Sequence, residues 1–178
     1  VCAEDTANRG GGYVYPVEAL DAIAAMARKN NATTHLDGAR LFNAQVKSNI
    51  SAATRTQNYD TVSVCFSKGL GAPVGSALCI PKAMRRDAIR ARKMLGGGMR
   101  QAGIIAAAAL YALENHIERL AEDHQKAQML AEGLAQHGYD VSPPQTNMVY
   151  FKHPNAQNIL EQANEQGIAA LTAKAQTI

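Results

Sequence analysis

Two short apolar runs in this chain each end in a charged residue that is followed at once by glycine. The run 32–36 leads into Asp37 and Gly38, and the run 61–67 leads into Lys68 and Gly69. Runs of this length predict strands rather than helices, and the glycines predict tight turns after them. We therefore expect a carboxylate and an amine at the carboxyl ends of two neighbouring strands.

Segments with helical periodicity separate these strands. A helix is expected from Pro16 to about Asn30, and another after Gly38. Further strands are expected over residues 1–4, 76–80, 139–141 and 147–151, and further helices over 82–94, 104–138 and 155–167. The alanine-rich start of the helix at 104–110 predicts close packing against neighbouring elements.

Strands that alternate with helices predict an α/β fold with a mostly parallel sheet and flanking helices. We expect residues 1–137 to form a large domain that lacks its N-terminal portion, because residues 1–4 resemble the end of a strand already in progress. Residues 138–178 are expected to begin a smaller, truncated α+β domain.

Composition excludes several function classes. A hydrophobic fraction of 47% is too high for a disordered chain, and a scattered net charge of +3 predicts neither a nucleic-acid nor a membrane partner. No signal peptide and no membrane-spanning run is recognisable. The three cysteines form no C-x-x-C motif, and Cys65 and Cys79 are expected as buried free thiols. A reducing, cytoplasmic location follows from this usage.

The charged residues at the strand ends predict a chemistry. Ligands of such sheets gather outside the carboxyl ends of the strands. Lys68, expected to be desolvated, would react with an aldehyde, and Asp37 would keep a pyridine nitrogen protonated, which is what pyridoxal phosphate requires. Ser67 is expected to bind the phosphate and Arg40 the phenolic oxygen or a substrate carboxylate, while Arg100 lies in a glycine-rich segment suited to phosphate.

Other interpretations of these residues stay open at this point. Asp37 is equally suited to cap a helix, or to bind a metal with His35, although no third ligand is near in sequence. Lys68 also fits an exposed turn. The glycines at 69, 71 and 75 are spaced one residue too widely for a dinucleotide-binding loop, and a P-loop would place its lysine after them.

Three blocks of sequence resemble one known family. They are HLDGARLFNA at 35–44, SKGLGAPVGS at 67–76, and RKM followed by GGGMRQ at 92–101. In this order they resemble the low-specificity L-threonine aldolases, pyridoxal-phosphate enzymes of the aspartate-aminotransferase-like fold. These enzymes cleave threonine and allo-threonine to glycine and an aldehyde by a retro-aldol reaction.

The resemblance also implies roles for individual residues. Lys68 would be the Schiff-base lysine, Asp37 the partner of the pyridine nitrogen, and Arg40 a neighbour of the ring and substrate. Arg100 would reach a phosphate in the adjacent subunit, which implies a homodimer or homotetramer with shared active sites. No metal is implied.

The chain departs from that family in two respects. Family members are nearly twice as long, and several of their cofactor and substrate contacts precede Val1 or follow Ile178. Where the family commonly has Glu-Asn-Thr, this chain has Glu4-Asp5-Thr6, which adds a negative charge.

Two alternatives to the threonine aldolase interpretation stay open. One is another enzyme of the same fold, either a β-eliminating lyase or one like serine hydroxymethyltransferase. The other is an inactive fragment or assembly module of such an enzyme.

Overall fold

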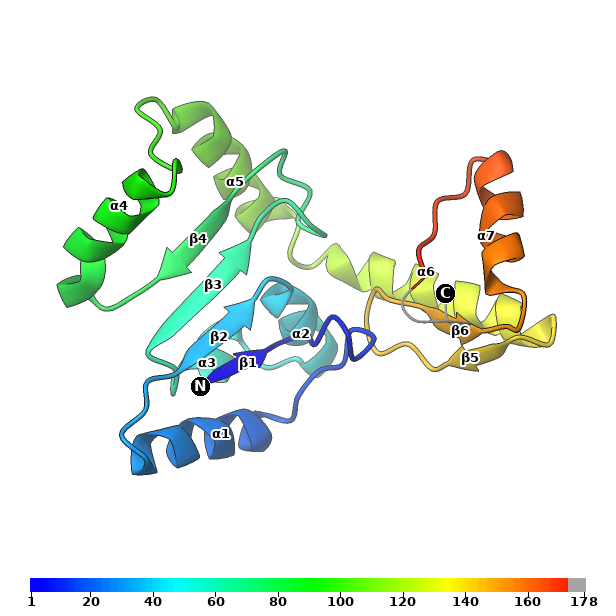
Figure 1. Ribbon diagram of the computed structural model, residues 1–178, viewed down its shortest axis with the longest axis horizontal. Helices are drawn as coiled ribbons and strands as arrows, with labels where there is room; N and C mark the ends of the chain where they lie inside the picture. Colours follow the sequence, from blue (N-terminus) through cyan, green and yellow to red (C-terminus); the bar gives the residue numbers. More distant parts are fainter. Residues whose placement is uncertain (173–178) are drawn as a thin grey trace. The chain divides into compact units, whose positions relative to one another are not determined.

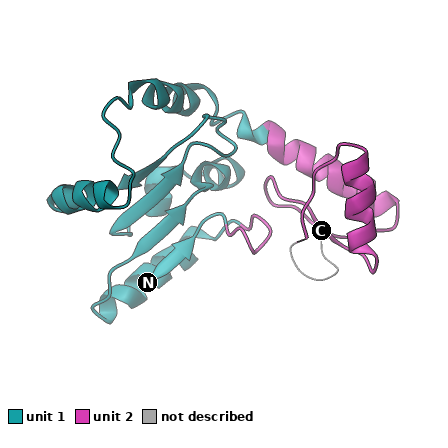
Figure 2. Ribbon diagram, turned by 45° about the horizontal axis from the view of Figure 1, so that its top comes forward, with its two compact units in different colours: residues 1–6, 14–121 teal, residues 7–13, 122–178 magenta. Residues whose placement is uncertain are grey.

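The computed structural model describes residues 1–172. By their internal contacts these residues form two compact units, shown in Figure 2. Unit 1 comprises residues 1–6 and 14–121, and unit 2 comprises residues 7–13 and the chain from Glu122 onward. The domain boundary predicted at residue 138 stays a prediction.

Unit 1 contains most of the predicted elements (Figure 1). Its strands are β1 (Cys2–Glu4), β2 (His35–Gly38), β3 (Thr61–Cys65) and β4 (Ser76–Cys79). Its helices are α1 (Val17–Lys29), α2 (Leu41–Ser48), α3 (Ala52–Thr56), the 3-10 turn η1 (Lys82–Met84), α4 (Arg85–Met94) and α5 (Gly103–Asn115). Helix α6 (Leu120–Gln136) begins at the end of unit 1 and continues in unit 2.

The four strands of unit 1 form one sheet in the order β1-β2-β3-β4. The first three are parallel, and β4 pairs antiparallel with β3. A parallel crossover needs about a dozen residues or more, and the connection 66–75 is shorter, so the chain turns straight back. The α/β prediction with a mostly parallel sheet is confirmed.

One face of this sheet carries the main core. Leu36, Val62 and Val64 pack there with Leu20 of α1 and Leu41 of α2. Crossovers between parallel strands are right-handed, so sequential strand order places the connecting helices on a single side. The opposite face presents the alternate residues, which are polar and half-buried: His35, Asp37, Thr61 and Ser63. The sheet is therefore apolar on one side and polar on the other.

Unit 2 is built around a small antiparallel pair. Strand β5 (Asp140–Ser142) pairs with β6 (Tyr150–Lys152), and helix α7 (Ala156–Glu165) follows. Ala156 and Leu160 of α7 pack with Phe151 and Ile159 in a local core. The predicted helix over 155–167 is thus confirmed, with the helix ending before Gly167.

Several expectations about packing are wrong. The helix predicted over 104–138 is interrupted at residues 116–119, giving α5 and α6. Only Ala109 and Ala112 of α5 are buried, and Ile104, Leu110 and Tyr111 are exposed, so the alanine-rich run lacks the close packing predicted for it. Cys65 is half-buried and Cys79 exposed, because Cys79 lies on the outermost strand of the sheet; both are free thiols.

Candidate active site

Asp37 lies at the carboxyl end of β2, with a half-buried side chain. In the parallel register its neighbours are Glu4 of β1 and Ser63 of β3. Its Oδ1 accepts a hydrogen bond from the backbone N–H of Ala39 at 3.0 Å, which fixes the carboxylate in the turn. Helix α2 begins only at Leu41, with Arg40 at its N-cap position. The capping interpretation of Asp37 is therefore wrong.

Lys68 lies three residues beyond β3 in a turn that a hydrogen bond from Gly71 N to Lys68 O closes at 2.8 Å. Its side chain and that of Ser67 are exposed, so the expectation of a desolvated lysine is wrong. The turn carries these residues outward, past the apolar part of the strand. Lys68 Nζ donates a hydrogen bond to Cys65 Sγ at 3.2 Å.

The turn that carries Lys68 is anchored by two kinds of contact at Leu70. Leu70 is buried in a cluster with Ala72, Ala112 and Leu120. Nδ1 of His116, between α5 and α6, lies 2.6 Å from the Leu70 carbonyl oxygen. A carbonyl oxygen can only accept, so His116 Nδ1 carries the proton. The side chain of His116 is half-buried.

Asp37 and the Lys68 amine lie on the same face of the sheet. Ser63 is the register partner of Asp37, and Cys65 is two residues further along β3, so alternation puts Cys65 on the Asp37 face. The Lys68 amine contacts that cysteine. The arrangement places an amine beyond β3 and a carboxylate at the end of β2, on one polar surface.

The other three predicted site residues have less direct relations to Asp37 and Lys68. Arg40 is half-buried beside Asp37 in sequence, and Arg100 is exposed between α4 and α5. Ser67 is exposed next to Lys68. Within residues 1–172, no hydrogen bond or ion pair joins Arg40, Ser67 or Arg100 to Asp37 or Lys68.

Sequence reasoning missed the residues that support Asp37 from β1. Glu4 is half-buried beside Asp37, and the backbone N–H of Asp5 donates to the Asp37 carbonyl at 2.9 Å. The Asp5 side chain is fully buried and pairs with Arg55 of α3. Burial raises the pKa of Asp5, although the Arg55 guanidinium acts to lower it. The only signal in the sequence was the aspartate in place of the usual asparagine.

Residues 1–172 contain neither a cluster of metal ligands nor a helix able to span a membrane. No three His, Cys, Asp or Glu side chains cluster there in a way that could hold a metal ion. His35 Nδ1 instead hydrogen-bonds Thr61 Oγ1 at 2.8 Å. Within the same residues, no helix is long and apolar enough to cross a membrane.

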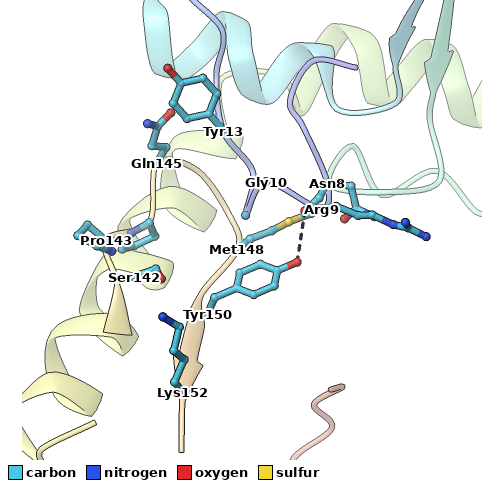
Figure 3. A pocket seen from close by; sticks show the side chains of 12 residues that line it. Asn8, Arg9, Gly10, Tyr13, Ser142, Pro143, Gln145, Met148, Tyr150 and Lys152 are labelled. Carbon is cyan, nitrogen blue, oxygen red and sulfur yellow. Dashed lines mark hydrogen bonds between the residues drawn. The ribbon is translucent and has the colours of Figure 1, made fainter. Parts of the chain in front are cut away.

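A cavity of about 750 Å³ lies within unit 2 (Figure 3). The loop 8–13 forms one wall, and residues from Ser142 to Lys152 form the other. Tyr150 OH donates to Asn8 O at 3.3 Å across one end, and Thr146 Oγ1 donates to Gly12 O at 2.8 Å. None of the five predicted site residues lines this cavity.

Comparison with known proteins assigns the chain to a family. The family model of the beta-eliminating lyases matches residues 1–155. The chain belongs to the beta-eliminating lyase family. It is 46% identical over 145 residues to the low specificity L-threonine aldolase of Escherichia coli K12, covering 82% of this chain and 44% of that protein. It is 42% identical over 157 residues to a probable low-specificity L-threonine aldolase 2 of Arabidopsis thaliana, covering 86% and 44%.

A solved structure shows the same fold as this chain. A putative L-allo-threonine aldolase of Listeria monocytogenes superposes with a TM-score of 0.83 at 26% identity, covering 99% of this chain and 53% of that one. The chain thus spans about half the length of the relatives that it matches. Enzymes of this family generally depend on pyridoxal phosphate.

Proposed function

We propose that the chain is the central part of a pyridoxal-phosphate-dependent aldehyde-lyase. Its reaction would be the retro-aldol cleavage of L-threonine and L-allo-threonine, β-hydroxy-α-amino acids, to glycine and an aldehyde. The observation that carries this proposal is the placement of the Asp37 carboxylate and the Lys68 amine on one polar face at the carboxyl edge of the sheet. The names of the aldolase relatives supply the substrate class.

The donor set fits pyridoxal phosphate. Lys68 presents an accessible primary amine, which is the group that binds the aldehyde carbon of this cofactor. Asp37 presents a carboxylate whose orientation the turn fixes, as needed beside a pyridinium nitrogen. Ser67 and Arg100 would supply phosphate contacts, and Arg40 would lie near the ring. When bound, the cofactor supplies an electron sink for the bond that breaks.

The residues of this chain would then have distinct tasks. Asp37 would hold the proton on the pyridine nitrogen, because a negative charge beside it favours the protonated form. Lys68 would hold the cofactor covalently through its side-chain amine. The general base is assigned to no residue of this chain.

The proposal includes assembly and location. Ile104, Leu110 and Tyr111 of α5 are exposed, and apolar surface of this kind favours a second subunit. We therefore propose a homodimer or homotetramer, in which Arg100 reaches the phosphate in the adjacent subunit. We also propose a cytoplasmic location. A second candidate function, an assembly part without activity of its own, is favoured by the coverage of only 44% of the aldolase relatives.

Borohydride trapping tests the proposal. The purified chain is mixed with pyridoxal phosphate, reduced, digested and mapped by mass spectrometry, alongside the longest natural protein that contains it. The reduced adduct is expected on Lys68 and is lost in Lys68→Ala, whereas the exposed control Lys82→Ala keeps it. Acetaldehyde release from threonine checks the substrate class. An absence of adduct in both proteins would overturn the proposal.

A further inference from the structure

The backbone of Lys68 is held in place, whereas its side chain is exposed. Its carbonyl is held by Gly71, and the neighbouring Leu70 is buried and held by His116. The four-carbon stem beyond that backbone is exposed. A lysine side chain carries about 2 kcal/mol of rotamer entropy, so a fixed backbone alone does not place its amine.

Cys65 supplies the contact that places the amine. Cys65 is the last residue of β3 and is half-buried, so its thiol is held by the sheet. The distance from Lys68 Nζ to Cys65 Sγ is 3.2 Å, and the two residues are three positions apart in the sequence. The sulfur lies on the same face as Asp37.

Sulfur is a weak hydrogen-bond acceptor, and this weakness suits the orientation of the Lys68 amine. A carboxylate in place of the thiol would pair with the ammonium and keep it protonated, which would oppose its reaction as a nucleophile. A thiol accepts only weakly, so it can orient the amine and release it. The contact restrains the amine without removing it from reaction.

We propose that Cys65 is a positioning residue for the Lys68 amine, holding Nζ on the Asp37 face of the sheet whenever the cofactor is not bound to it. The inference rests on the proposed function, in which Lys68 binds pyridoxal phosphate. It adds a residue of β3 to that site, acting through Lys68 and not on the substrate.

The first experiment tests the contact without any cofactor. o-Phthalaldehyde joins one amine and one thiol that lie side by side into a fluorescent isoindole, with loss of two water molecules. We expect a bridge between Cys65 and Lys68 in the wild-type chain and in Cys79→Ala, and its loss in Cys65→Ser and Lys68→Ala. Peptide mapping identifies the bridge. If the wild-type protein forms no such bridge, the inference is wrong.

The second experiment measures the rate at which pyridoxal phosphate condenses with Lys68, followed by visible absorbance. Cys65→Ala should slow this step by about threefold to tenfold, the size of one hydrogen bond, while Cys65→Ser and the control Cys79→Ala stay near the wild-type rate. Cys65→Asp should move the pH dependence of condensation upward, because a carboxylate favours the ammonium form. A general loss of structure would produce neither the serine rescue nor this shift.

The outcomes separate the inference from the function on which it rests. A wild-type chain that forms the adduct on Lys68 at a rate that Cys65→Ala leaves unchanged would refute the positioning role and leave the proposed function standing. A chain that forms the isoindole bridge but, like the longest natural protein that contains it, no adduct with pyridoxal phosphate would refute both the proposed function and the role assigned to Cys65.

Discussion

The buried carboxylate of Asp5 accepts a hydrogen bond from Arg55 Nε at 2.8 Å, and Arg55 Nη2 lies 2.7 Å from the same Oδ2 in an ion pair. Both side chains are fully buried. Arg55 also donates to Ser48 Oγ at 3.0 Å and to the carbonyl of Tyr15 at 2.6 Å. Because the backbone of Asp5 bonds to Asp37, the ion pair connects α3 to the strand that carries the candidate carboxylate.

Removing one partner of this pair should destabilise the protein strongly. Asp5→Asn leaves a buried guanidinium without its counter-charge, which costs about 3–5 kcal/mol. Urea denaturation measures the change. The matched control is Glu122→Gln, which breaks the exposed pair of Glu122 with Lys126 and should cost less than about 0.5 kcal/mol. Equal effects of the two substitutions would contradict a structural role for the buried pair.

The Asp37 carboxylate should matter for chemistry more than for folding. Under the proposed function, Asp37→Ala would remove the charge beside the pyridine nitrogen, so we expect threonine cleavage to fall by about a hundredfold or more, the size of a lost electrostatic contact. Steady-state kinetics of the longest natural protein that contains this chain measure the loss. Asp87→Asn, on the exposed surface of α4, serves as the control and should leave activity unchanged.

Stability in acid should depend on Asp60. Its Oδ2 accepts hydrogen bonds from Thr34 N at 2.7 Å and Thr34 Oγ1 at 2.9 Å, and these hold its pKa below the ordinary value of 3.8. The unfolded chain then takes up the proton first as pH falls, so this contribution is present above 3.8 and is lost as pH falls through the lowered pKa.

The test compares unfolding free energies across that pH range. Asp60→Asn should flatten the decrease in stability between about pH 5 and pH 2, since the titrating group is gone. Thr34→Val, which removes one of the two donors, should flatten it partly. A variant curve parallel to that of the wild-type protein would show that Asp60 does not contribute.

Gly12 should tolerate no side chain. Its φ is +74°, and a Cβ there would overlap Thr146 Oγ1, which bonds to the Gly12 carbonyl. Gly12→Ala should therefore destabilise the protein by at least about 2 kcal/mol, from the unfavourable backbone and the overlap together. Gly133→Ala is the control, because space is open around this helical glycine and alanine should stabilise by about 0.5–1 kcal/mol.

A shared active site can be tested by mixing two inactive variants. If Arg100 of one subunit serves the cofactor of the next, Lys68→Ala and Arg100→Ala subunits should restore part of the activity when they are denatured together and refolded. Each variant refolded alone is the control. No recovery, with mixed oligomers present by mass spectrometry, would argue for sites built within one subunit.

The parts of the fold that local pattern determines could be predicted from the sequence. Alternation and short length identified β2 and β3, and 3.6-residue periodicity identified α1. The α/β class followed from their order. The end of the sequence, 173–178, lies outside the described residues, so the smaller domain expected over 138–178 is described only in part.

The features that were missed depend on contacts between distant segments. Asp5 and Arg55 are 50 positions apart, and no pattern in the sequence links them. His116 has a polar neighbourhood in sequence, yet it bonds to a carbonyl 46 positions away. The sequence left both a desolvated and an exposed Lys68 open, because the choice depends on how far the turn extends past β3.

The bond between His116 and the Leu70 carbonyl has a consequence for the order of folding. The sheet of unit 1 is complete at Cys79, yet the turn that bears Lys68 is anchored by a residue that follows α5. Contacts between residues far apart in the sequence form late in folding, because the entropic cost of closing the loop must be met before the contact can add stability. A nascent chain would therefore hold its strands before the Lys68 turn is fully held, and a premature stop before residue 116 would leave the turn without its bond to His116.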